Sequence, residues 1–132
     1  MSATRAIYLD ASAIAKLVER EPESAALASY LRRRPTRVSS AIARTEVIRA
    51  ARGEPDRLRR ARQVLGDMGL IRVSDRILDA AGKVPPVELR SLDAIHLASA
   101  EQLEGDLGTF VTYDDRLAAA AAARGMKVAQ PR

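Results

Sequence analysis

The stretch Ala6-Ile7-Tyr8-Leu9-Asp10 decides how this chain of 132 residues is expected to fold, because a short apolar run ends there on a carboxylate. Four consecutive apolar residues fit a strand that is buried on both faces. The residues after Asp10 change to helical spacing, with Ile14, Leu17 and Val18 on one face. A buried strand followed directly by an amphipathic helix is typical of a parallel α/β sheet.

The rest of the chain repeats this alternation of short apolar runs and amphipathic stretches. Further strands are expected at 37–39, 70–73, within 107–112 and at 127–129. Helices are expected between them, at 22–34, 41–51, 58–68, 75–82, 92–103 and 116–123, with Ser40, Ser74 and Ser91 as N-caps and Gly69 as a C-terminal stop. The pattern predicts an α/β fold with a parallel sheet of about four to five short strands, flanked by helices on both faces.

The composition sets the class of protein. The chain has the length of a single domain over residues 1–132, and 47% of its residues are hydrophobic, enough for a packed core. It contains no cysteine, which excludes a disulfide framework and a thiolate metal site. No apolar run approaches the roughly 18 residues of a membrane span, and nothing before Asp10 is typical of a signal peptide. We therefore expect a soluble, cytoplasmic protein with no membrane partner.

The formal net charge of +5 suits a polyanionic partner, nucleic acid above all. Arginine on solvated helix faces explains the same charge equally well. Two arginine clusters are candidate phosphate contacts, namely Arg32, Arg33 and Arg34 with Arg37, and Arg57, Arg59, Arg60 and Arg62. The first cluster also fits cations that settle at a helix C-terminus.

Four carboxylates are expected at the edge of the sheet where the strands end. Asp10 and Asp114 each follow a predicted strand, Asp93 lies in the first turn of its helix, and Glu46 borders the apolar face of its own. Right-handed crossovers gather the carboxyl ends of parallel strands at one edge, where such sheets hold their sites. Converging carboxylates repel one another, and Mg²⁺ or Mn²⁺, which prefer oxygen ligands, relieve that repulsion. The sequence thus predicts metal-assisted hydrolysis of a phosphodiester.

Other residue types exclude other chemistries. The single histidine, His96, leaves a two-histidine attack through the RNA 2′-hydroxyl without its acid and base. A zinc site would need more nitrogen or sulfur ligands than the chain has, and no glycine-rich phosphate loop occurs. We interpret His96 itself as a packed, hydrogen-bonded helix residue.

Four blocks, at residues 8–13, 45–47, 92–98 and 111–114, resemble in order and spacing those of the PIN-domain family, and more narrowly the VapC toxins of type II toxin–antitoxin pairs. The resemblance implies an endoribonuclease that requires Mg²⁺ or Mn²⁺. If a metal-bound water attacks the phosphorus without help from the 2′-hydroxyl, the products carry a 5′-phosphate and a 3′-hydroxyl. The resemblance assigns catalysis and metal binding to Asp10, Glu46, Asp93 and Asp114, with Ser12 and Thr112 as accompanying cofactor-binding hydroxyls. The role of Asp115, beside Asp114, is left open.

The resemblance also implies three partners: an RNA substrate, a cognate VapB-like antitoxin and a second copy in a homodimer. An apolar groove between the first helices is a hypothesis for antitoxin docking, near Leu17, Val18, Leu27 and Leu31. Plain core packing explains most of those residues better.

Three rival interpretations come from other classes. A phosphatase that forms an aspartyl-phosphate would show a second Asp at position 12, where Ser12 stands. A receiver-like domain would need an acidic pair at the first strand and a lysine after a late one, but Lys127 begins its strand. The third is a non-catalytic RNA- or partner-binding module with the same fold, which metal-dependent turnover would separate from an enzyme.

Overall fold

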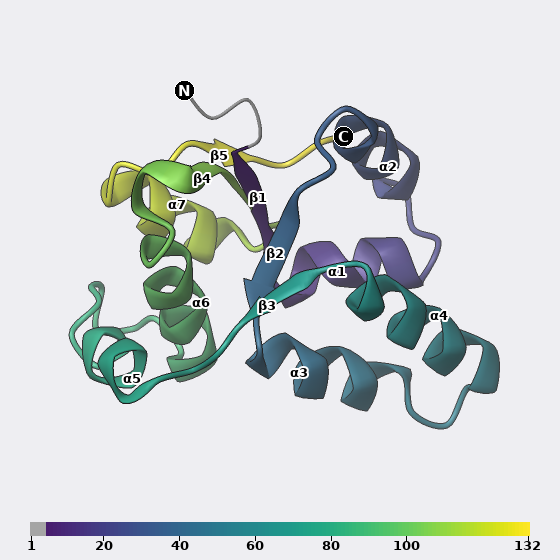
Figure 1. The fold of residues 1–132 in the computed structure, drawn as a ribbon, viewed down its shortest axis with the longest axis horizontal. Helices are drawn as coiled ribbons and strands as arrows, with labels where there is room; N and C mark the ends of the chain where they lie inside the picture. The colour runs from purple at the N-terminus through teal and green to yellow at the C-terminus, as the bar shows by residue number, and fades with distance from the viewer. Residues whose placement is uncertain (1–4) are drawn as a thin grey trace.

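The computed structural model describes residues 5–132 and contains a parallel sheet of five strands (Figure 1). The order of the strands across the sheet is β3 (Gly69–Ile71), β2 (Arg37–Ser40), β1 (Ala6–Leu9), β4 (Leu107–Val111) and β5 (Val128–Ala129). The predicted fold class is confirmed. The central position of β1, between β2 and β4, explains why all four of its residues are apolar and buried, since helices cover both of its faces.

The helices form a layer on each side of the sheet (Figure 1). One layer holds α1 (Ala11–Val18), α2 (Ser24–Arg32), α3 (Ile42–Ala51) and α4 (Pro55–Gly66). The other holds α5 (Asp75–Ala81), α6 (Ser91–Glu101) and α7 (Asp115–Ala123), with a short 3₁₀ turn at Glu104–Asp106. Among residues 5–132, no helix has both the length and the apolarity to cross a membrane.

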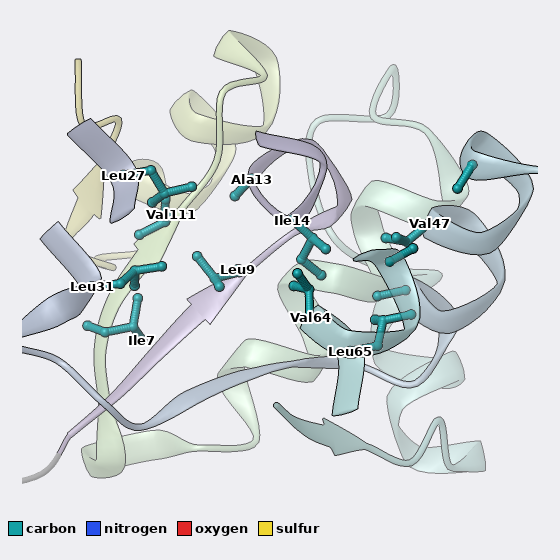
Figure 2. Packing of buried hydrophobic residues seen from close by; sticks show 13 residues of the cluster. Ile7, Leu9, Ala13, Ile14, Leu27, Leu31, Val47, Val64, Leu65 and Val111 are labelled. Atoms are coloured by element: carbon teal, nitrogen blue, oxygen red, sulfur yellow. The ribbon is translucent and has the colours of Figure 1, made fainter. Parts of the chain in front are cut away.

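The core consists of two clusters, one under each helix layer. Leu9 and Val111 pack with residues of α1 to α4 in the first cluster, which Figure 2 shows. Tyr8 and Phe110 point to the opposite face and pack with α5, α6 and α7 in the second. Leu27 and Leu31 are fully buried in the first cluster, so core packing accounts for half of the residues in the docking hypothesis.

Side-chain caps begin the helices that follow β1 and β4. The Asp10 carboxylate accepts a hydrogen bond from the backbone N–H of Ala13, and Asp114 accepts from those of Arg116 and Leu117. Ser74 caps α5 in the same way, as predicted. An N-terminal carboxylate also suits the helix dipole. Asp10 and Asp114 are therefore both fixed at the point where a strand turns into a helix.

Several predicted boundaries were wrong by a few residues. Gly69 does not stop a helix but opens β3, because α4 already closes when Asp67 and Met68 bond back to Val64 and Leu65. Ser91 is the first residue of α6 rather than its cap, which is Arg90 with no side-chain hydrogen bond. The helix after Pro22 begins at Ser24.

Candidate functional site

Asp10 is the buried centre of the candidate site. Its Oδ1 accepts from Ser12 Oγ at 2.7 Å and from the Ala13 N–H at 2.9 Å, and its Oδ2 accepts from Thr112 Oγ1 at 2.6 Å. Burial raises the pKa of Asp10, and the hydrogen bonds from Thr112, Ser12 and Ala13 oppose that rise. Both predicted hydroxyls therefore hold this carboxylate; whether they also serve a cofactor stays a prediction.

Thr112 links Asp10 to the second acid, Asp114. The hydroxyl that donates to Asp10 also accepts the backbone N–H of Asp114 at 3.1 Å. The N–H of Tyr113, between them, donates to Ser12 Oγ at 2.9 Å. The pairing of Leu9 with Val111 across β1 and β4 brings these turns together at the carboxyl edge of the sheet. The geometry follows from parallel pairing, as the sequence predicted.

The third acid, Asp93, lies in the first turn of α6 and faces Asp114 across one guanidinium. Arg90 Nε lies 3.6 Å from Asp93 Oδ2, and Arg90 Nη2 lies 3.6 Å from Asp114 Oδ2. Burial and the negative charge of Asp114 raise the pKa of Asp93, while Arg90 opposes the rise. The Arg90 side chain is 79% exposed, against 20% for Asp93 and 25% for Asp114. The two carboxylates thus repel each other, and the exposed guanidinium of Arg90 offsets part of that repulsion.

The fourth acid, Glu46, is held from α6 by the only histidine. His96 Nε2 lies 2.7 Å from Glu46 Oε1, and His96 Nδ1 lies 2.7 Å from the Tyr8 hydroxyl. The interpretation of His96 as a packed, hydrogen-bonded residue is confirmed. Its contact with Glu46 was missed, although His96 follows Asp93 by three residues and so lies on the same side of α6.

A pocket of about 870 Å³ opens beside Asp93 and Asp114, between α6, α7 and the segment before α6. Its floor is apolar, formed by Pro85, Pro86, Leu89, Ala119, Ala120 and Ala123. Its charged residues include Arg90, Arg116 and Arg124, which sequence reasoning did not single out. Asp10 and Glu46 do not line it. The structure therefore links the four predicted acids through a network but brings only two of them into one pocket.

Half of the arginines in the two candidate phosphate-binding clusters contact other groups of the protein. Arg57 pairs with Glu19 at 2.7 Å, Arg59 pairs with Asp56 at 2.8 Å, and Arg60 donates to the carbonyl of Leu17 at 3.0 Å. Arg34, just beyond α2, donates to the carbonyl of Tyr30 and stacks on its ring. The helix C-terminus explanation holds for Arg34.

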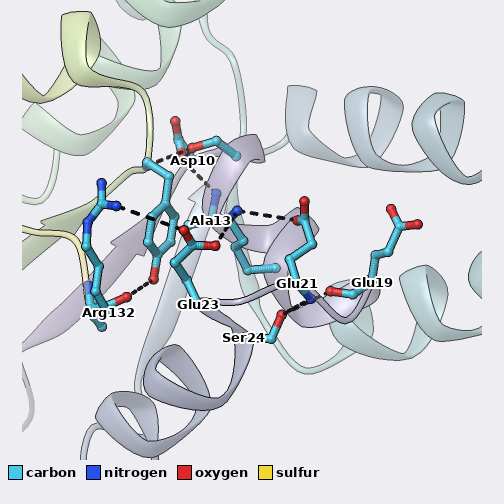
Figure 3. A network of polar contacts seen from close by, with 11 residues as sticks. Asp10, Ala13, Glu19, Glu21, Glu23, Ser24 and Arg132 are labelled. Carbon is cyan, nitrogen blue, oxygen red and sulfur yellow. Dashed lines mark hydrogen bonds and ion pairs between the residues drawn. The ribbon is translucent and has the colours of Figure 1, made fainter.

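The C-terminal segment contacts the carboxyl edge of the sheet on the side that α1 and α2 cover. The hydroxyl of Tyr113 donates to the carbonyl of Pro131 at 2.8 Å. Arg132 lies 3.9 Å from Glu23, which also accepts from Lys16 at 2.8 Å (Figure 3). The Lys16 contact lowers the pKa of Glu23. The turn that carries Thr112 and Asp114 is thus held on two sides.

The fit of this site to a divalent cation can be tested on its donors. Within residues 5–132, no group of three acidic or histidine side chains is arranged to hold one ion. Asp93 and Asp114 nevertheless offer hard oxygen donors whose mutual repulsion a cation would relieve. Mg²⁺ in proteins often binds through one or two carboxylates, with water and substrate phosphate completing its shell. The pair therefore fits such an ion, whereas the expected gathering of all four acids around one point is not found.

Comparisons with known proteins agree with this architecture. The PIN domain family matches residues 7–123. Ribonuclease VapC46 of Mycobacterium tuberculosis is 56% identical, over 96% of this chain and 98% of the relative. Ribonuclease VapC47 of the same species is 37% identical, over 95% of this chain and 96% of the relative.

A solved structure shares the fold. That of the Mycobacterium tuberculosis toxin VapC20, described as cleaving the sarcin–ricin loop, superposes with a TM-score of 0.70 over 95% of this chain and 99% of the other. At 16% identity this likeness concerns the fold alone. The parallel sheet, the order of the four acidic blocks and the matches over nearly the whole chain lead to one conclusion: the chain belongs to the PIN-domain family, in its VapC branch.

Proposed function

We propose that this chain is a single-domain endoribonuclease that depends on Mg²⁺ or Mn²⁺ and acts as the toxin of a toxin–antitoxin pair. The observation that carries the proposal is the Asp93–Asp114 pair, two mutually repelling carboxylates in a pocket that also holds three arginines. The relatives named as VapC ribonucleases, one of them 56% identical, support the same activity.

In this proposal Asp93 and Asp114 hold the ion. Asp10 and Glu46, which do not line the pocket, add negative charge to the site. When bound, the ion would lower the pKa of a water and offset charge on the phosphodiester oxygens. Arg116, which makes no ion pair among residues 5–132, would bind the RNA backbone beside the carboxylates. Ser12 and Thr112 keep Asp10 oriented through their hydrogen bonds. Attack of water in line with the leaving 3′-oxygen gives a 5′-phosphate and a 3′-hydroxyl.

The proposed partners are RNA, a VapB-like antitoxin and a second copy of the chain, and the proposed location is the cytoplasm. Membership of the VapC branch supports each of these partners and this location. Leu17 and Val18, which are only partly buried against the first core cluster, line a second pocket of about 640 Å³ between α1, α2 and α4. That pocket is the proposed binding site of the antitoxin.

The test is cleavage of a mixed RNA substrate by wild type, Asp10→Asn and Asp93→Asn. Each amide removes a charge at nearly constant volume, so both variants should stay folded and lose cleavage. Asp79→Asn, an exposed position on α5, is the matched control and should cleave as wild type does. Retained cleavage in both site variants, or 2′,3′-cyclic phosphate ends, would rule out this mechanism.

The alternative is a non-catalytic module that binds RNA or a partner through the same fold. One observation favours it: Arg90 already offsets the Asp93–Asp114 pair, and no three-acid group is formed within residues 5–132. RNA binding by the wild type without turnover at any Mn²⁺ concentration would establish that alternative.

A further inference from the structure

The pocket beside Asp93 and Asp114 extends well beyond these two carboxylates. Its volume of about 870 Å³ lies within the range of roughly 300–1,000 Å³ that is typical of pockets for small organic ligands. Asp93 and Glu101 both line it, and their separation of eight residues corresponds to about 12 Å along α6. At the Glu101 end, Arg124 also lines the pocket and contacts both oxygens of Glu101, at 2.6 and 3.0 Å. The pocket is therefore longer than a cation needs, since Mg²⁺ holds its ligands at about 2.1 Å.

The lining between these two charged ends is apolar. Ala119, Ala120 and Ala123 follow Arg116 by three, four and seven residues, so the four side chains share one face of α7. Leu89 adds an apolar surface from the segment before α6. Methyl groups leave open the space that longer side chains would fill, and they neither donate nor accept hydrogen bonds. This part of the pocket therefore suits an apolar surface of a ligand, not a phosphate or a hydroxyl.

The faces of the bases are the apolar parts of an RNA chain. Proteins bind unstacked bases on apolar or aromatic side chains and on guanidinium planes, and form hydrogen bonds with the base edges. Here the floor offers a surface for the face, and the Glu101–Arg124 pair offers both acceptors and donors for the edge. Arg116 lines the same pocket and offers a cation for the phosphate. A hydrocarbon chain would use the floor but gain nothing from these charges, so the lining as a whole favours a nucleotide.

We propose that the apolar floor of this pocket binds one unpaired base of the RNA, next to the phosphate held at the Asp93–Asp114 end. This inference rests on the proposed nuclease function, which places the phosphate. A base within a duplex has its faces stacked and its edge paired, so it cannot enter until it leaves the helix. The floor would then select the nucleotide beside the bond to be cut.

Nuclear magnetic resonance of the wild-type protein in Mg²⁺ tests the inference with small probes. Each of the four nucleoside 5′-monophosphates is compared with ribose 5-phosphate, which has the same sugar and phosphate but no base. At least one nucleotide should bind about 5-fold or more tightly than ribose 5-phosphate, the low end for contacts to a base. It should also shift the methyl signals of Ala119 and Ala123. Equal affinity for all five probes, or shifts confined to other residues, would overturn the inference.

A matched pair of variants on α7 tests the floor itself. Ala119→Leu places a larger apolar side chain in the pocket, whereas Ala122→Leu makes the same change at an exposed position that does not line it. Leucine is a good helix former, and Ala119 is also exposed, so both variants should fold. Ala119→Leu should lose the preference for nucleotide over ribose 5-phosphate, and Ala122→Leu should keep it. Ala123→Leu repeats the test at a second exposed position of the floor. An unchanged preference in both floor variants would overturn the inference.

The results distinguish this inference from the nuclease proposal, because a mononucleotide contains no bond for the enzyme to cut. Base-dependent binding at the floor by a protein that cleaves no RNA would refute the nuclease proposal and leave the base site standing. Cleavage of RNA by a protein that binds ribose 5-phosphate as well as any nucleotide would do the reverse.

Discussion

Thr112 Oγ1 donates a hydrogen bond of 2.6 Å to Asp10 Oδ2, joining two residues that lie 102 positions apart in the chain. The same oxygen accepts the backbone N–H of Asp114. One hydroxyl therefore ties together the carboxyl ends of β1 and β4 and the two acids that follow them. Removing the Thr112 hydroxyl should lower both the stability and the activity of the protein.

Thr112→Val should destabilise the protein and weaken catalysis together. The substitution keeps the shape of the side chain but leaves the buried Asp10 oxygen without its shortest hydrogen bond, at a cost of about 1–3 kcal/mol. Urea unfolding at neutral pH measures the loss. Thr112→Ser, which retains the hydroxyl, is the control; equal stability of the two variants would mean that the bond contributes nothing.

Asp93→Asn should stabilise the fold at neutral pH while it removes activity. Because the folded pKa of Asp93 is raised, the native state binds the proton more tightly than the unfolded chain, and stability falls as pH rises through that range. The gain from the amide should be about 0.5–1 kcal/mol, typical of partly exposed charges. This gain should be complete above the folded pKa and should vanish below the unfolded pKa of about 3.9.

Unfolding curves for wild type and Asp93→Asn across this pH range measure the difference. Asp79→Asn, at an exposed position on α5, is the control for these curves. A gain that grows as the pH falls would have the wrong sign for a carboxyl whose pKa is raised on folding.

Arg90→Gln should tighten the binding of Mn²⁺ in the absence of RNA. The guanidinium lies 3.6 Å from both Asp93 and Asp114, where it competes with any cation for the same charges. Removing it should increase affinity about 2- to 5-fold, the size of an interaction between partly exposed charges. Calorimetry on the free protein measures this change.

Arg124→Gln is the control for Arg90, because Arg124 lines the same pocket but is engaged with Glu101 through bonds of 2.6 and 3.0 Å. Its Mn²⁺ affinity should match that of wild type. Unchanged or weaker binding in Arg90→Gln would show that Arg90 does not occupy the site of the cation.

Arg116→Gln should weaken RNA binding and make it less sensitive to salt. Each phosphate contact that is lost lowers the slope of log affinity against log salt by about 0.7 for single strands. Anisotropy titrations at several salt concentrations, in an Asp93→Asn background that does not cleave, give this slope. Arg59→Gln, whose partner is Asp56, should leave the slope unchanged.

Much of the fold follows from local sequence. The apolar run before Asp10 marks the central strand, and Ser74 and Asp114 begin their helices as short side chains with cap oxygens should. The roles predicted for Gly69 and Ser91 were wrong because a glycine or serine near the end of a helix or strand fits several positions. Which position it takes depends on where the backbone hydrogen bonds of that element begin.

The site, too, has a part that local sequence predicts and a part that depends on long-range packing. Asp10 and Asp114 meet because parallel strands end together, which the sequence pattern contains. The contact between His96 and Glu46 depends on how α6 lies against α3, across 50 residues, and no local pattern encodes that packing. Arg90 and Arg116 were overlooked because arginines elsewhere form denser clusters in the sequence, of which Arg57, Arg59 and Arg60 are paired with the protein's own acids and carbonyls.

The most direct test of the account is RNA cleavage by purified wild-type protein in EDTA, followed by addition of Mn²⁺ in excess of the chelator. The account predicts no product in EDTA and full recovery on addition of Mn²⁺, with 5′-phosphate ends and no recovery in Asp93→Asn. Cleavage that proceeds unchanged in EDTA would contradict it.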